Sequence, residues 1–236
     1  MKIASLFTLC LVTGNALADS HTDQASAHRW SGCQAGLNVG AAWLQTEGAF
    51  IDYVVPDNAG GYDMPDASGT GVAGGGQVGC SVQRGRLVFG LEGMFDGTGA
   101  DQRENLPSAG FADEIYTTEM NWFATVTGKI GVTITPQLLV YAKGGAAFME
   151  TDYTDEAADA TYRATGDDSH TGWTVGGGAT FALDAHWSVF GEYTYLDFGS
   201  SRVTLTSEID TATYPDWINR YDHEVHAVIF GANYRF

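Results

Sequence analysis

The sequence predicts an all-β fold: an eight-stranded antiparallel barrel that crosses a membrane. Three observations lead to this prediction. Eight short segments alternate between large apolar residues and small or polar residues, and the polar side of several segments carries charges. Short and long connections alternate along the chain. Glycine is abundant, with 31 among 236 residues, and the absence of a three-residue glycine repeat excludes a collagen-like chain.

The composition narrows the class of protein before any motif is considered. The chain has 29 acidic residues against 11 lysines and arginines, which gives a formal net charge of −18 at pH 7. This excess of acid argues against a nucleic-acid partner, which needs clustered lysine and arginine. The apolar share of 44% is too high for a disordered acidic chain. The composition therefore indicates a folded, glycine-rich, acidic protein.

The first residues are predicted to be a secretory signal peptide rather than part of the fold. A short basic start is followed by a mostly apolar run at 3–12 and by a small-x-small cleavage site that ends at Ala18. We therefore predict a cleaved signal peptide at 1–18, a short periplasmic tail at 19–29 and an outer-membrane barrel domain at 30–236. No later stretch has the roughly 18 uninterrupted apolar residues of a transmembrane helix.

The first four predicted strands carry large apolar residues at alternate positions, which is the period of a β-strand. These strands are expected at about 31–45, 72–83, 86–96 and 119–133. The positions between the apolar residues hold glycine and polar residues, and in the third and fourth strands they also hold charges. The apolar sets are Cys33, Ala35, Leu37, Val39, Ala41 and Trp43; Val78, Cys80 and Val82; Leu87, Phe89, Leu91 and Phe95; and Trp122, Ala124, Val126 and Ile130.

The last four strands are expected at about 138–149, 171–183, 186–197 and 224–236. The first of these is ambiguous. If Lys143 points inward, Leu139 and Tyr141 must do so too, because they share its side of the strand. The apolar sets of the other three strands are Trp173, Val175, Ala179, Phe181 and Leu183; Trp187, Val189, Tyr193 and Tyr195; and Val228, Phe230, Ala232, Tyr234 and Phe236.

The alternation is inverted relative to a soluble β-protein. A water-soluble sandwich buries its apolar face and exposes its charges, whereas a membrane barrel turns the apolar face to lipid. Glycine on the inner face fits a narrow lumen, where facing side chains compete for little volume. Two roles are open for the inner charges: a gated conductance through breakable ion pairs, or a plug that holds the barrel shut, which we favour. The predicted lumen charges are Glu92, Lys129, Glu192 and Arg235, with Lys143 as a further candidate.

The connections between the strands indicate how the barrel is oriented. Three are short, at 84–85, 135–137 and 184–185, while the four others each hold on the order of twenty residues. Short periplasmic turns and long extracellular loops are expected of an outer-membrane barrel. Tryptophans near both predicted membrane faces fit two aromatic girdles. We expect Trp30 and Trp187 at one face and Trp43, Trp122 and Trp173 at the other.

Five motifs follow one another along the chain: Trp30-Ser31-Gly32 with Gly36 and Gly40, 74–79 (GGGQVG), 89–93 (FGLEG), 191–199 (GEYTYLDFG) and 230–236 (FGANYRF). In this order they resemble the small outer-membrane β-barrel proteins of Gram-negative bacteria. These are of the OmpA-barrel and opacity-protein type, and the match is best to the short porin-like branch without a peptidoglycan-binding domain. The resemblance implies that both chain ends are periplasmic. It also implies an insertion signal that the outer-membrane insertion machinery reads in Phe230, Tyr234 and Phe236. An open pore is not expected, because eight strands enclose room only for side chains.

Two cysteines remain after the predicted cleavage, Cys33 and Cys80, and both fall on the outward side of neighbouring strands. Antiparallel neighbours can bring two such residues within disulfide reach, and the export route is oxidising. We therefore predict a disulfide, with free buried thiols as the alternative. A catalytic cysteine is not expected, since no histidine is placed near either residue.

The acidic residues gather in the long connections and their flanks. The segments 47–69, 96–119, 150–168 and 197–224 hold 24 acids against four arginines, a net charge of −20. One interpretation is contact with anionic lipopolysaccharide through shared calcium or magnesium. The others are an electrostatic contact with a basic ligand and a solvated surface with no ligand. No segment has the spacing of a calcium-binding loop, so any metal binding would be diffuse.

The leading functional hypothesis is a non-enzymatic integral outer-membrane protein that serves envelope integrity and surface interaction through its acidic loops. The alternatives are a narrow channel for small solutes or ions and a lipid-modifying enzyme at the barrel rim. Asp168-Ser169-His170 and Asp222-His223 are the loop candidates for such an enzyme, but adjacent residues cannot form a catalytic triad by themselves. We expect no enzymatic activity and no cofactor, and the sequence leaves the oligomeric state open.

Overall fold

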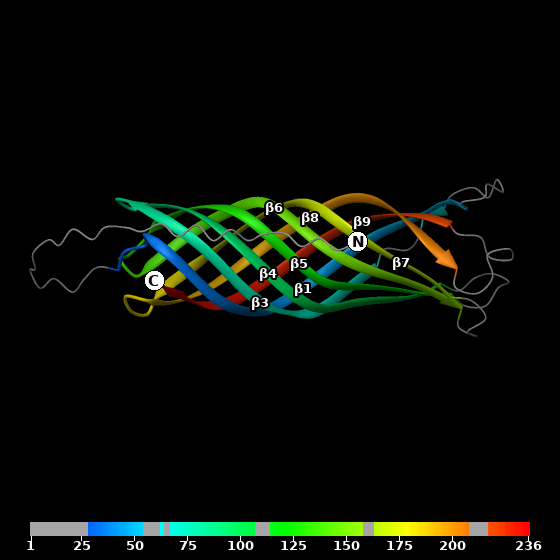
Figure 1. Ribbon diagram of the computed structural model, residues 1–236, viewed down its shortest axis with the longest axis horizontal. Helices are drawn as coiled ribbons and strands as arrows, with labels where there is room; N and C mark the ends of the chain where they lie inside the picture. Colours follow the sequence, from blue (N-terminus) through cyan, green and yellow to red (C-terminus); the bar gives the residue numbers. More distant parts are fainter. Residues whose placement is uncertain (1–27, 54–61, 64–66, 107–113, 158–162, 208–216) are drawn as a thin grey trace, which may run out of the picture.

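The computed structural model describes residues 28–53, 62–63, 67–106, 114–157, 163–207 and 217–236. The predicted signal peptide and most of the predicted tail lie outside these residues. Nine strands are present along the described chain (Figure 1). They are β1 (Gly32–Tyr53), β2 (Tyr62–Asp63), β3 (Ala67–Arg84), β4 (Leu87–Leu106), β5 (Glu114–Thr133), β6 (Leu138–Ala157), β7 (Arg163–Ala182), β8 (Trp187–Ser207) and β9 (Trp217–Arg235).

The eight long strands form a closed antiparallel barrel, as predicted. Neighbouring strands in the chain are neighbours in the sheet, and pairing of β1 with β9 closes the ring. The two-residue strand β2 pairs only with the far end of β1. The three short turns and the C-terminus lie at one end of the barrel, and the strand ends next to the long connections lie at the other (Figure 1). Following the predicted orientation, we call the first the periplasmic end and the second the outer end. Among the described residues, no helix is long and apolar enough to cross a membrane.

The strands are longer than predicted at the end that carries the long connections. β4 continues to Leu106 and β7 already begins at Arg163, in segments that the sequence suggested were loops. Outside the lipid an apolar face is not required, so these extensions lack the alternation that marks a membrane strand. Their ladders bear irregularities near the limit of the apolar belt, for example between Gly97 and Ala100 and between Asp197 and Ser200.

The outward face is apolar, which confirms the inverted pattern. Leu37 and Leu91 are 76% and 72% exposed on the barrel exterior. At the outer end of this lipid-facing belt, the aromatic side chains of Phe95 and Trp122 stack with ring centres 5.4 Å apart. Further exposed apolar residues of the belt are Val39, Trp43, Val78, Phe89, Val126, Ile130, Phe148, Trp173, Phe181, Trp187, Val189 and Phe230.

The inward face is only partly what the sequence suggested. The ambiguous strand β6 turns Leu139, Tyr141 and Lys143 inward, where all three are buried. The prediction of a small and polar lumen is wrong for the outer half, where a cluster of large apolar side chains fills the interior. An eight-stranded barrel has to fill its interior with side chains, and these residues do so. The cluster includes Leu44, Met94, Met120, Phe123, Met149, Leu196, Phe198, Val225 and Ile229.

Candidate functional site

Four predicted or candidate lumen charges form one buried cluster near the periplasmic end. Glu92, on β4, lies between two lysines: its Oε2 is 2.7 Å from Lys129 Nζ, and its Oε1 is 3.4 Å from Lys143 Nζ. Lys143 also contacts Glu192 of β8. The Tyr141 hydroxyl donates a 2.7 Å hydrogen bond to Glu192, and Lys129 Nζ lies 4.2 Å from the centre of the Tyr141 ring. The cluster thus links strands β4, β5, β6 and β8 across the lumen.

This arrangement suits a structural plug. Each glutamate contacts at least one lysine, and Lys143 contacts two glutamates, so the buried charges compensate one another. On the periplasmic side the cavity beside Glu92 and Lys129 measures about 30 Å³, which leaves room for no more than a few water molecules. The buried side chains of the cluster and this small cavity therefore leave little open volume beside Glu92 and Lys129.

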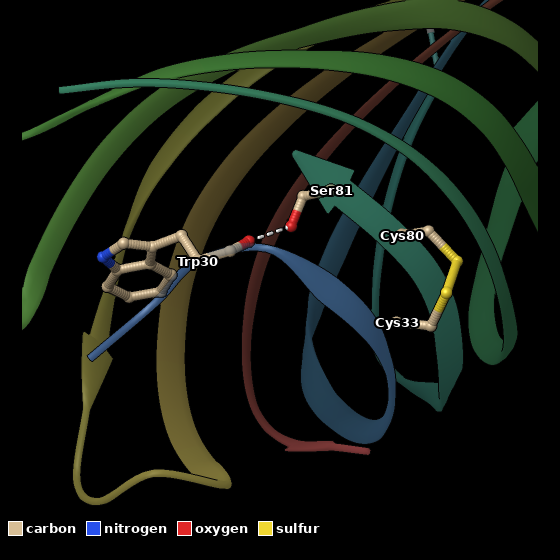
Figure 2. Close-up of a disulfide and its surroundings, with 4 residues drawn as sticks. All are labelled: Trp30, Cys33, Cys80 and Ser81. Carbon is tan, nitrogen blue, oxygen red and sulfur yellow. Dashed lines mark hydrogen bonds between the residues drawn. A yellow bond between two sulfur atoms is a disulfide. The ribbon is translucent and has the colours of Figure 1, made fainter. Parts of the chain in front are cut away.

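The periplasmic mouth is closed by Trp30, and here the sequence prediction was wrong. Trp30 was expected in the lipid-facing girdle, but its side chain is only 2% exposed. It reaches across the mouth, where its indole Nε1 donates a 3.2 Å hydrogen bond to the carbonyl of Pro136. Its backbone N–H donates to Gln83 Oε1 at 2.9 Å, and its carbonyl accepts from the Ser81 hydroxyl (Figure 2). Trp30 precedes β1, so strand alternation gave no guide to its side.

Arg235 faces inward at this same mouth, apart from the other predicted lumen charges. Its guanidinium lies 5.3 Å from the Trp30 ring centre, which is within the range of a cation–π contact. It also donates to Gln34 Oε1 at 3.2 Å and to the carbonyl of Arg29, and its Nη1 lies 2.9 Å from His28 Nε2. Arg235 therefore ties the last strand to the segment that enters the first.

The predicted disulfide is present. Cys33 of β1 and Cys80 of β3 are directly paired in the ladder, with Cα atoms 4.0 Å apart, and their sulfurs are bonded. Figure 2 shows the disulfide pointing away from Trp30 and Ser81. The bond lies on the barrel exterior, at the end where Trp30 fills the mouth. It covalently fixes the β1–β3 pair that flanks the Trp30 segment.

Two histidines meet at the outer mouth, beyond the aromatic edge of the lipid-facing belt. The sequence suggested that His170 and His223 lie in loops, but they belong to β7 and β9 and face inward. The Tyr153 hydroxyl lies 3.1 Å from His170 Nε2 and 2.5 Å from His223 Nε2. Thr46 Oγ1 lies 3.0 Å from His223 Nδ1, and Asp168 Oδ2 lies 3.8 Å from His170 Nδ1. A chain of polar contacts therefore crosses the mouth from β1 to β7.

Burial keeps both histidines neutral. Burial, and to a smaller extent the neighbouring His170, lowers the pKa of His223 to about 3. Burial also lowers the pKa of His170, against the opposing effect of the Asp168 carboxylate. Burial is likewise the main reason that the pKa of the Tyr153 hydroxyl is raised. At neutral pH the two histidines and the Tyr153 hydroxyl therefore form an uncharged, hydrogen-bonded lid over the apolar cluster.

The exterior just beyond the belt carries a row of acids that sequence reasoning did not resolve. Asp101, Glu119, Asp152 and Asp167 lie on four neighbouring strands, β4 to β7, and all four are exposed. The ladder pairs Asp101 with Glu119, Glu119 with Asp152, and Asp152 with Asp167. We call these four residues the acidic ladder. Only the register, which a sequence does not show, reveals that they lie side by side.

Like charges are also paired elsewhere at this end of the barrel. Asp197 of β8 faces Glu224 of β9, and Glu47 of β1 faces Asp222 of β9. Positive charge is also present, since Arg103 lies 3.9 Å from Glu156 in an exposed ion pair. Within the described part of the chain, no three His, Cys, Asp or Glu side chains are arranged to hold one metal ion.

Comparison with known proteins settles the family. The chain matches the family described as "Outer membrane protein beta-barrel domain" over residues 7–236. The chain belongs to this family. Its family and its relatives place it in the outer membrane of Gram-negative bacteria. The 31 kDa outer-membrane immunogenic protein of Brucella melitensis biotype 1 is 26% identical over 242 residues, covering 100% of this chain and 97% of the relative. Its counterpart from Brucella suis biovar 1 is also 26% identical over 242 residues.

Solved structures show the same fold for this member of the family. The outer membrane protein OprG from Pseudomonas aeruginosa aligns with a TM-score of 0.53 and 13% identity, covering 89% of this chain and 98% of OprG. The outer membrane protease OmpT from Escherichia coli aligns with a TM-score of 0.52 and 9% identity, covering 87% of this chain and 97% of OmpT. At such identities the likeness concerns the fold alone.

The predicted insertion residues lie on the lipid side of the closing strand. Phe230, Tyr234 and Phe236 are 60%, 42% and 74% exposed. Their side chains are therefore available on the exterior of β9, which pairs with both β8 and β1. Recognition by the insertion machinery stays a prediction from the resemblance.

Proposed function

We propose that this barrel is a non-enzymatic outer-membrane protein that stabilises the cell envelope. In this proposal the closed barrel is a rigid anchor, and its acidic outer end is the working surface. Divalent cations shared with lipopolysaccharide hold that surface to its surroundings. The acidic ladder is the observation that carries the proposal.

The acidic ladder creates a local need for cations. Directly opposed side chains on antiparallel strands have Cβ atoms about 5 Å apart, and like charges there destabilise the sheet. The ladder makes three such contacts in a row, from Asp101 through Glu119 and Asp152 to Asp167. Asn121 donates a 2.8 Å hydrogen bond to Asp152, but an amide does not neutralise a carboxylate. Bound cations would relieve the repulsion along the ladder.

The position of the ladder favours lipopolysaccharide as the second partner. Glu119 and Asp152 lie only a few residues beyond Trp122 and Phe148, at the outer edge of the apolar belt. Aromatic residues of a membrane barrel mark the interface with the lipid headgroups. The ladder therefore lies at headgroup height, where anionic lipid groups are available. Magnesium commonly binds one or two protein carboxylates together with phosphates of a second molecule.

The filled interior supports an anchor rather than a channel. Trp30 occupies the periplasmic mouth, the Glu92–Lys143–Glu192 cluster lies above it, and apolar side chains fill the outer half. Each of these layers would have to move to admit a solute. The same packing makes the barrel rigid, since buried side chains interlock closely.

A strain that lacks this gene tests the proposal. It is complemented with the wild-type protein or with a ladder variant that carries D101N, E119Q, D152N and D167N. We expect the wild type to restore resistance to detergent and to chelator, and the ladder variant to restore it only in part. Added magnesium should rescue the empty strain. With purified protein, lipopolysaccharide binding should require magnesium and should weaken at least several-fold in the ladder variant.

A second four-acid variant controls for net charge. It carries D57N, D159N, E208Q and D210N, which remove the same charge from segments outside the described residues. This control should behave as the wild type in cells and in the binding assay. Equal performance of the ladder variant and the wild type in both assays would show that the ladder does not carry the function.

A further inference from the structure

Asp96 is a buried acid that the charge cluster does not accommodate. It lies on β4, one inward position beyond Met94 and two beyond Glu92, and its side chain is fully buried. Both of its carboxylate oxygens are enclosed, and the contact that the Asn38 side chain makes with Asp96 is not a hydrogen bond of normal geometry. An ionised carboxylate in such a place is costly unless something compensates its charge.

The surroundings of Asp96 are rich in oxygen acceptors. Gly75 of β3 is paired both with Asp96 of β4 and with Asn38 of β1. A Cβ on Gly75 would lie 2.7 Å from Asp96 Oδ1, so this glycine leaves the space into which Asp96 leans toward Asn38. Asn38 uses its Nδ2 on Gln77, at 2.8 Å, while its Oδ1 is buried without a partner. The Oγ1 of Thr125, diagonal to Asp96 on β5, is buried without a partner as well.

The charges in this part of the lumen do not balance. Glu92 and Glu192 are matched by Lys129 and Lys143 in the ion pairs of the cluster. Asp96 adds a third acid, which is close enough to Lys143 and Glu192 to interact with both electrostatically. Arg235 does not supply the missing charge, because its contacts are at the periplasmic mouth. If every group is ionised, the buried centre of the barrel carries one uncompensated negative charge.

We propose that the barrel interior binds one monovalent cation at Asp96, held by the Asp96 carboxylate and the Asn38 Oδ1 oxygen. One positive charge completes the balance, whereas a divalent ion would leave the centre positive. The ligand atoms are all oxygens, which suits a proton or a hard alkali ion. A proton would make Asp96 a neutral acid that can donate to Asn38. A sodium ion would be coordinated by the same oxygens.

Thermal unfolding of the purified protein in detergent tests this site, followed by circular dichroism. In one series pH is raised from 5 to 9 at constant sodium, and in the other choline replaces sodium at constant pH and ionic strength. If the ligand is a proton, the wild-type unfolding temperature falls by several degrees as pH rises. If it is sodium, the temperature falls by several degrees as choline replaces sodium. Asp96→Asn, which has the same shape without the charge, should remove whichever response is observed.

Glu47→Gln is the matched control, because Glu47 is an exposed acid on β1, the strand of Asn38, and lies outside the acidic ladder. It should keep the wild-type response in both series. The proposal is overturned if Asp96→Asn follows the wild type in both. Should Asp96→Asn fail to fold, the wild type itself decides. Infrared spectroscopy detects a neutral buried carboxyl group, dialysis against radioactive sodium detects a bound ion, and a negative result in both experiments excludes the site.

Discussion

At the scale of single residues, Lys143 is the side chain that joins the two glutamates of the buried charge cluster. Of the two lysines in the Glu92–Lys129–Lys143–Glu192 cluster, Lys143 contacts both glutamates, whereas Lys129 contacts only Glu92. Its side chain is fully enclosed, whereas that of Lys129 is 13% exposed. A buried charge that loses its partner is far more costly than one at the edge of a cluster. The two lysines should therefore differ sharply in their contribution to stability.

Replacing Lys143 with methionine should lower the free energy of unfolding by about 3–5 kcal/mol, because Glu92 and Glu192 would lose their shared cation. Lys129→Met provides the comparison, since it removes one ion pair and leaves Lys143 in place. Equilibrium unfolding in detergent with urea measures both variants. Equal losses in the two would contradict the central role of Lys143.

The outer mouth makes stability depend on pH. His223 stays neutral in the folded barrel, because its pKa is lowered from 6.5 to about 3. The unfolded chain binds a proton as pH falls below about 6.5, so the free energy of unfolding decreases by about 1.4 kcal/mol per pH unit between those two values. His223→Gln should lose this share of the acid sensitivity. Unfolding curves at pH 5 and pH 7 give the difference, and a variant that keeps the full wild-type slope would exclude His223 as its source.

Strand alternation predicted which charged residues face inward, but it could not show their partners. Parity alone placed Glu92, Lys129 and Glu192 on one face, and Lys143 was tied to Tyr141 on the same side of β6. The same parity places Met94, between Glu92 and Asp96, in the lumen, so the apolar filling of the outer half was predictable from the sequence. The inward position of Trp30 was not predictable, because Trp30 precedes β1 and the direction of its side chain depends on how the chain enters the mouth.

At the scale of elements, the sequence located the membrane-spanning part of each strand and missed the extensions. Lipid imposes an apolar face, and that face is the signal that a reader of the sequence detects. Beyond the belt, β4 to β7 are held by backbone pairing and by side-chain contacts such as Asn121–Asp152 and Tyr153–His170. These contacts leave no alternating pattern in the sequence, so the acidic segments resemble loops. The acidic ladder was hidden for this reason, although each of its four acids was counted among the loop charges.

The disulfide acts on the first strand pair. Cys33 and Cys80 are separated by 47 positions, and closing a loop of that length stabilises a fold by roughly 2–4 kcal/mol. The double variant Cys33→Ser, Cys80→Ser should therefore still form the barrel, because β1 and β3 remain paired from Gly32 to Thr46. It should unfold at lower denaturant concentration by that amount. Reduced wild-type protein should match the variant, and a variant as stable as the oxidised protein would exclude this role.

At the scale of the whole molecule, charge and closure are divided between the two ends. The periplasmic end is closed by Trp30 and tied by Arg235, while the outer end carries the acids and the neutral histidine lid. The net charge of −18 therefore describes one end of the molecule rather than its whole surface. Glycine contributes to the interior, where residues such as Gly75 make room for larger inward neighbours.

Three layers of side chains close the barrel interior, and they predict how substitutions change its ion conductance. Barriers in series each limit the flow, so removing one of them leaves the others in control. Trp30→Ala opens the mouth, Lys143→Ala breaks the charge cluster and Phe123→Ala thins the apolar layer. In planar bilayers the wild type and each single variant should show no stable openings, whereas a folded triple variant should conduct. Circular dichroism of each variant first confirms the barrel. Stable and reproducible openings of the wild type would support the narrow-channel alternative. Openings of a single variant, with a closed wild type, would mean that the layers do not act in series.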